Sequence, residues 1–188
     1  MKVDLFDPES ESWLPPSSFP DLTGCERIAI DLETRDPNLT TLGPGWCRDD
    51  GYVIGYAVAA GDFVGYFPVR HESGNLPEKK VVNWLKKQLA TPHIEKVMHN
   101  CMSGEYLGEW KNEKMLKSAA DMYGVDPKGG MWKLDSTFVG RYAEQDAAVT
   151  LRLWDRLRGD LVNDECTGIF DLESSLLPVL LDMKTRGV

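Results

Sequence analysis

The sequence predicts an α/β domain built on a mixed β-sheet flanked by helices. Three observations support this class: strand-like segments come first, one amphipathic helix then leads to a further short strand, and helix-like segments follow. A crossover helix between two strands places those strands parallel in one sheet. Strands joined by a short turn lie antiparallel instead, so the sheet is expected to be mixed.

The first half of the chain contains the strand signals. Residues 1–24 are rich in Pro, Ser and acidic side chains, and we expect them to form an extended N-terminal arm. Arg27–Glu33 is a β-rich run that predicts the first strand. Tyr52–Ala59 and Phe63–Val69 are separated by a short turn containing Gly61, a spacing typical of a β-hairpin.

Helical periodicity dominates the second half. Residues 76–91 begin with Leu76-Pro77-Glu78 and then carry apolar side chains at helical spacing, which predicts a crossover helix. The short strand Glu95–His99 should then lie parallel to the first strand. Three further helices are expected, at Asn112–Tyr123, Phe138–Leu161 and Thr167–Arg186. We divide the chain into the arm, one domain over residues 25–166, and a terminal helix over residues 167–188.

Composition excludes several classes of protein. No apolar stretch approaches the roughly 20 residues that a membrane crossing needs, and the N-terminus lacks a secretory signal, so we expect a cytoplasmic protein without a membrane segment. The 21 basic and 30 acidic residues give a net charge of −9, which argues against binding nucleic acid by bulk electrostatics. Cationic contacts with a polyanion would have to be local.

Two acids end the first predicted strand. In Asp31-Leu32-Glu33, period-two alternation places both carboxylates on one face and Leu32 on the other. Two carboxylates this close can share a hard cation. Solvated acids that precede a turn would produce the same pattern, so the motif alone does not establish a site.

Two weaker motifs belong to the same picture. Asn100 follows the predicted parallel strand and lies at the sheet edge where ligands bind in open α/β sheets. Tyr142 and Asp146 share one helix face, and Ala143 and Ala147 form an adjacent face small enough to pack closely on a sheet. Taken singly, these motifs are better explained as a turn amide and an exposed acid on an amphipathic helix.

Together these motifs occur, in this order, in one enzyme group. The chain resembles the 3′-to-5′ proofreading exonuclease domain of phage-type family A DNA polymerases, in the tyrosine branch of the ribonuclease H-like DEDD superfamily. The matching stretches are IAIDLET, VMHN, YGVDPKGGMW, YAEQDAAVTLRLW and LLPVLLDMKTRGV. The resemblance implies a ribonuclease H-like fold in a phage-infected or bacterial cell, and a terminal helix that leads toward a polymerase domain.

The resemblance also implies a role for each matching residue. Asp31, Glu33 and Asp146 would hold two divalent metal ions, Mg²⁺ or Mn²⁺. Tyr142 would orient the attacking water, because a phenol with an ordinary pKa of about 10 is a poor base at neutral pH. Thr34 and Asn100 would bind the terminal nucleotide. The expected reaction is hydrolysis of the last phosphodiester bond of a single-stranded DNA 3′ end, as proofreading for a polymerase domain or subunit.

The sequence departs from this family after Asn100. The family pattern Asn-x-x-x-Asp requires a fourth acid where this chain has Gly104. Between Met102 and Ser103 a stretch of a few dozen residues, with that acid and a fifth strand, is expected to be missing. Three explanations compete: the protein carries those residues, the gene has lost them, or Glu105 replaces the acid. We favour the first, because losing an edge strand and a helix would cost several kcal/mol.

Two other functions fit the same residues. A ribonuclease D-like enzyme would cut RNA, since the choice between ribose and deoxyribose depends on contacts to the 2′ position. A catalytically silent module would bind DNA ends or buttress a polymerase. Retention of Asp31, Glu33, Tyr142 and Asp146 weighs against the silent module, and the missing fourth acid weighs for it.

Overall fold

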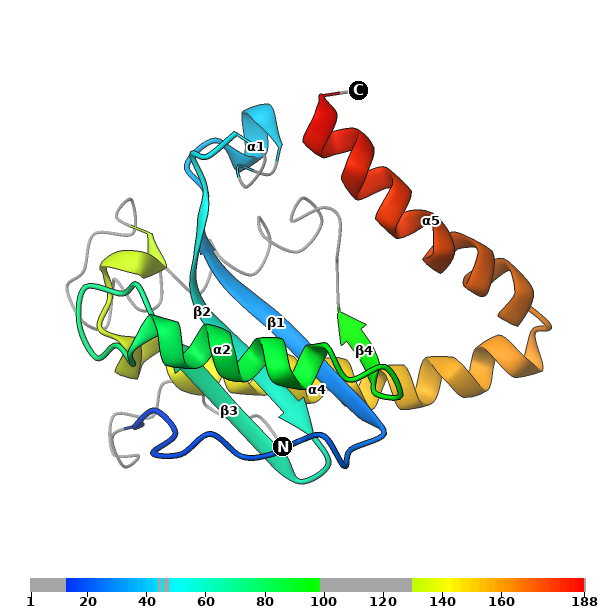
Figure 1. Ribbon diagram of the computed structural model, residues 1–188, viewed down its shortest axis with the longest axis horizontal. Helices are drawn as coiled ribbons and strands as arrows, with labels where there is room; N and C mark the ends of the chain where they lie inside the picture. Colours follow the sequence, from blue (N-terminus) through cyan, green and yellow to red (C-terminus); the bar gives the residue numbers. More distant parts are fainter. Residues whose placement is uncertain (1–12, 44, 46–47, 99–129, 188) are drawn as a thin grey trace.

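A computed structural model of the chain describes residues 13–43, 45, 48–98 and 130–187 (Figure 1). The expected helix at residues 112–123, Asn100 and the expected break after Met102 lie outside the described residues.

Within the described residues, four strands form one mixed sheet in the order β3-β2-β1-β4. They are β1 (Arg27–Arg35), β2 (Tyr52–Ala60), β3 (Phe63–Pro68) and β4 (Glu95–Met98). β1 pairs antiparallel with β2 and parallel with β4, and β2 pairs antiparallel with β3. The predicted α/β class with a mixed sheet is confirmed, and the arrangement is compatible with a ribonuclease H-like fold.

The helices agree with the predicted ones within a few residues. They are α1 (Leu39–Leu42), α2 (Glu78–Leu89), η3 (Met131–Lys133), α4 (Ser136–Asn163) and α5 (Thr167–Arg186). The sequence did not predict α1 or η3, which are too short to show a period. In the part of the chain that the structure describes, none of the helices has the length and apolar character of a membrane span.

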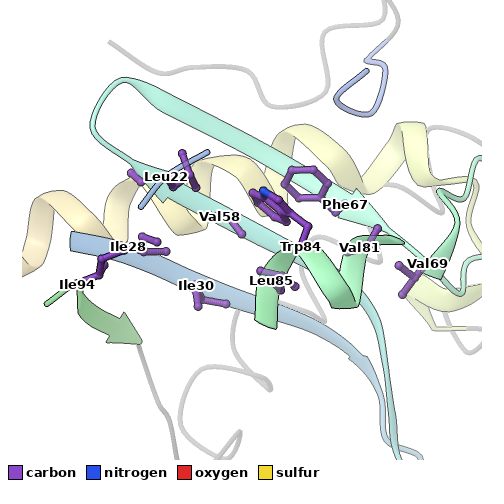
Figure 2. Packing of buried hydrophobic residues seen from close by; sticks show 11 residues of the cluster. Leu22, Ile28, Ile30, Val58, Phe67, Val69, Val81, Trp84, Leu85 and Ile94 are labelled. Carbon is purple, nitrogen blue, oxygen red and sulfur yellow. The ribbon is translucent and has the colours of Figure 1, made fainter. Parts of the chain in front are cut away.

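An apolar cluster fills the face of the sheet beneath α2. Ile28 and Ile30 of β1 and Val58 of β2 point to this face, and Phe67 of β3 packs against Trp84 of α2 with the rings tilted and their centroids 4.5 Å apart (Figure 2). Alternation along each strand selects these positions. Burying side chains of this size stabilises the domain by roughly 1.5–3 kcal/mol each.

α4 covers the opposite face of the sheet, where alanines line the contact beside β1 and larger buried side chains such as Tyr66 and Val97 lie around it. Ala29, Ala57 and Ala59 of the sheet and Ala143 and Ala147 of α4 are all fully or nearly fully buried. Without large side chains between them, helix and sheet can approach closely. This contact sets the distance between α4 and β1.

From Trp13 onward the N-terminal arm joins the two helical layers. Trp13 lies on Gly140 and its indole hydrogen bonds to Glu144, both on α4. Farther along, the Pro20 carbonyl accepts a hydrogen bond of 2.6 Å from the indole N–H of Trp84 on α2. The arm therefore packs as part of the domain, passing beside β3 (Figure 1).

The contact between Trp13 and Gly140 gives a test of this packing. A Cβ at Gly140 would overlap the Trp13 ring, so we expect Gly140→Ala to lower the free energy of unfolding by roughly 1–3 kcal/mol in urea denaturation. Gly159 lies in the same helix with open space around its Cβ position, and Gly159→Ala should raise stability by roughly 0.5–1 kcal/mol.

A Trp13→Ala background provides the control. Removing the ring removes the overlap, so Gly140→Ala should become neutral or stabilising there. Equal effects of Gly140→Ala in both backgrounds would show that Trp13 does not lie on this glycine in solution.

Candidate active site

β1 carries two acids on the face that α4 covers. Asp31 and Glu33 follow Ala29 at period two, so all three share that face. Asp31 pairs across the sheet with Ala57, and Glu33 with Gly55. Both partners are small, and the space above Gly55 is taken by the Tyr66 ring. Glu33 is 5% exposed, and Asp31 is half-buried.

α4 supplies the facing residues. Tyr142 and Asp146 are four residues apart, and the Tyr142 hydroxyl donates a hydrogen bond to the Asp146 carboxylate. The charges of Asp31 and Asp146 both act on Glu33. The structure thus brings together the four residues that the sequence analysis selected as catalytic. Two come from β1 and two from α4, and the two pairs are more than 100 residues apart along the chain.

The concentration of acids changes the titration of the site. Burial raises the pKa of Glu33 to about 8, and the negative charges of Asp31 and Asp146 add to the shift. Burial, the charge of Glu33 and the hydrogen bond to Asp146 raise the pKa of Tyr142. At neutral pH Tyr142 is therefore a phenol, and the Glu33 carboxyl is largely protonated.

Of the two expected nucleotide-binding residues, Thr34 lies in the described part of the chain and Asn100 lies outside it. Thr34 lies next to Glu33 at the end of β1 and its side chain is exposed, so it is accessible to a ligand.

The pairing of β1 with β2 shifts register after Glu33. Glu33 pairs with Gly55 and Thr34 with Val53, so β2 carries an extra residue, Ile54. Such bulges redirect strand ends and are frequent next to active sites.

A buried tyrosine–histidine pair lies beside the acids, and the sequence analysis did not find it. The Tyr66 hydroxyl and His71 Nε2 are 2.7 Å apart, and His71 Nδ1 is 3.2 Å from the Leu134 carbonyl. Because a carbonyl only accepts, Nδ1 donates, and Nε2 of the neutral imidazole accepts from Tyr66. Burial lowers the pKa of His71, which keeps it neutral.

Gly55 makes room for this pair. A Cβ at Gly55 would overlap the Tyr66 hydroxyl, so the tyrosine ring crosses β2 over this glycine toward Glu33. Burial, then the charges of Glu33 and Asp31, raise the pKa of Tyr66. A glycine in the middle of a strand was the only sequence signal, since it marks a close approach.

The donor set suits a hard divalent cation, because carboxylate oxygens are the preferred ligands of Mg²⁺ and Mn²⁺. Within the described residues, no three side chains of His, Cys, Asp or Glu lie close enough together to hold one ion. Enzymes usually bind Mg²⁺ through one or two carboxylates, with water and substrate phosphate completing the shell. The acids therefore fit Mg²⁺ or Mn²⁺ bound with substrate, and not a closed site of protein ligands alone.

Comparison with known proteins relates the chain to a polymerase. No protein-family model matches it. It is 35% identical to a DNA-directed DNA polymerase of Pseudomonas phage M6, in an alignment that includes all of this chain and 35% of the phage protein. The chain thus spans about a third of that relative. The alignment has 235 positions and the chain 188 residues, so at least 47 positions have no residue in this chain.

The raised pKa of Glu33 predicts how stability depends on pH. The unfolded chain loses this proton near pH 4.5 and the folded chain near pH 8. Between these values the folded state binds more protons, so its stability falls as pH rises. In urea denaturation with EDTA, we expect a fall of a few kcal/mol between pH 5 and 8, most of which Glu33→Gln removes.

Glu72→Gln is the matched control, because Glu72 is exposed and should leave the wild-type pH dependence in place. If Glu33→Gln showed the same fall as the wild-type protein, Glu33 would not be the buried group that titrates.

Proposed function

We propose that this chain is a metal-dependent 3′-to-5′ exonuclease domain that removes the terminal nucleotide of single-stranded DNA ends and proofreads for a DNA polymerase. One observation carries the proposal: Asp31 and Glu33 of β1 meet Tyr142 and Asp146 of α4 on one face of the sheet. Clustering three carboxylates lowers the free energy of unfolding because like charges repel one another. A bound cation with a phosphate ligand would offset this repulsion.

Each residue has a task in this reaction. When bound, two divalent ions, Mg²⁺ or Mn²⁺, supply the activation of water and the stabilisation of the departing 3′ oxygen. Asp31, Glu33 and Asp146 would hold them. Tyr142 stays protonated and donates to Asp146, which leaves lone pairs on its oxygen to accept a hydrogen bond from the attacking water. Thr34, exposed beside Glu33, would contact the terminal nucleotide.

Two observations support a polymerase as the partner. The relative named above is a phage DNA polymerase, and this chain matches only a part of it. In addition, α5 exposes apolar side chains along its length, among them Ile169, Leu172, Leu176 and Val179 at 42–65% exposure. α5 extends away from the sheet (Figure 1), so a neighbouring domain could cover this surface.

The fourth acid decides between an active and a silent domain. The alignment with the phage polymerase contains at least 47 positions without a residue in this chain, which is the size of the stretch expected to be missing after Met102. We propose that the protein carries such a segment. An intact mass well above 21.1 kDa for the purified protein is the expected result, and a mass of 21.1 kDa would favour the silent module.

Trimming of a 3′-labelled single strand tests the activity. We expect Mg²⁺-dependent release of nucleoside 5′-monophosphate, and a fall in rate of about 100-fold or more in Asp31→Ala and Asp146→Ala, since each removes a metal ligand. Both variants should remain folded, because removing an acid relieves repulsion. Asp62→Ala, in the exposed turn between β2 and β3, should keep wild-type activity.

The same assay separates the alternatives. Faster trimming of RNA than of DNA of equal sequence would indicate a ribonuclease D-like enzyme. Binding without Mg²⁺-dependent trimming would indicate the silent module. Full activity in both Asp31→Ala and Asp146→Ala would show that the catalytic centre lies elsewhere.

A further inference from the structure

Cations and aromatic rings alternate at the end of the sheet where the acids lie. The Arg35 guanidinium is 4.9 Å from the ring centroid of Trp132 and 5.5 Å from that of Tyr52. Arg70 is 5.4 Å from the Tyr52 ring, and Lys133 Nζ is 5.4 Å from the Trp132 ring. We call these five residues the cation–aromatic cluster. None of them belongs to the candidate active site.

The cluster is continuous with the acids. Arg35 follows Glu33 by two residues on β1, which places its Cα roughly 7 Å farther along the strand. Tyr52 is the cross-strand partner of Arg35. Trp132 and Lys133 belong to η3, which contacts β1 and precedes the helix that carries Tyr142. A ligand bound to the acids and extending past Arg35 would reach the cluster next.

The backbone holds the cluster in a fixed arrangement. The Ile54 carbonyl, at the extra residue of β2, accepts hydrogen bonds from Val69 N–H at 2.9 Å and Arg70 N–H at 3.1 Å. The Trp132 carbonyl accepts from Glu72 N–H at 3.1 Å, which fixes η3 to the segment after β3. These hydrogen bonds tie β2, the segment after β3 and η3 together at the backbone.

The cluster concentrates positive charge in a protein that is acidic overall. Three cations gather here although the chain has a net charge of −9. Arg70 is paired with Glu78, whereas Arg35 and Lys133 lie over ring faces and keep a positive charge available. Surfaces that bind single-stranded nucleic acid usually combine aromatic rings, on which bases stack, with cations that contact phosphates.

We propose that the cation–aromatic cluster binds the single-stranded nucleic acid just upstream of its 3′ terminal nucleotide. Bases stack on Trp132 and Tyr52 and on the Arg35 guanidinium, and Lys133 contacts a phosphate. The proposal rests on the exonuclease function for the position of the 3′ end. The binding itself needs no metal ion and no cleavage.

Binding is measured by fluorescence anisotropy in EDTA, with a labelled single strand of deoxythymidines about twelve nucleotides long. We expect Trp132→Ala and Arg35→Gln each to raise the Kd by about 5- to 100-fold, since stacking on one base contributes about 1–3 kcal/mol. Trp132→Phe retains a ring and should keep most of the affinity. A strand of uridines in a second arm shows whether DNA is preferred.

The salt dependence gives a readout that a merely structural role would not change. Loss of one phosphate contact lowers the slope of log Kd against log salt by about 0.7 for a single strand. Lys133→Gln should show that decrease, and Lys79→Gln, which removes an exposed lysine of α2, should not. Thermal unfolding of every variant checks its fold, and Lys133, being exposed, is the substitution least able to disturb it.

The outcomes of this experiment and of the trimming assay are separable. Two results would overturn the cluster as a binding surface, whatever the trimming assay shows. One is that the wild-type protein shows no saturable binding. The other is that Kd and salt slope are unchanged in folded Trp132→Ala and Lys133→Gln. Loss of affinity in these variants, in a protein that does not trim DNA, supports the cluster and overturns the exonuclease function alone.

Discussion

Small side chains on both sides of the contact between α4 and the sheet determine where the acids of this domain meet. Ala143 and Ala147 of the helix pack against Ala29 and Ala57 of the sheet, and the helix can therefore lie close to β1. The polar residues that flank these alanines on α4 then reach the two acids of β1. A larger residue in this layer would move the helix outward and separate the two halves of the site.

This arrangement has an energetic cost that the remainder of the fold must offset. Glu33 is buried among like charges and keeps its proton at neutral pH, which is unfavourable for a carboxyl group. Its buried neighbours Tyr66 and His71 form a neutral pair and add no charge. The apolar cluster under α2 lies on the face of the sheet opposite the acids. Stability is thus concentrated in one part of the domain and electrostatic strain in another, as is common around active sites.

Local pattern was sufficient to predict the strands and the longer helices of the described residues, and the acid pair. Alternation on β1 and the four-residue spacing of Tyr142 and Asp146 depend on neighbouring residues only. Long-range geometry could not be predicted in the same way. The proximity of Tyr66 to Glu33 depends on the register of three strands and on Gly55. His71 had no sequence signal, because its partners are a tyrosine on β3 and a carbonyl more than 60 residues away.

The bulge in β2 links the two polar surfaces of the domain. By inserting Ile54 opposite the step from Glu33 to Thr34, it bends the strand ends where the acids stop, and its carbonyl positions the backbone of Arg70. Negative charge therefore gives way to positive charge within a few residues of one strand, from Asp31 to Arg35. A protein with an excess of acids can accept a polyanion only if repulsion is overcome locally. In the proposed reaction the cations would meet the phosphates before the acids do, and the acids would in turn depend on bound metal ions.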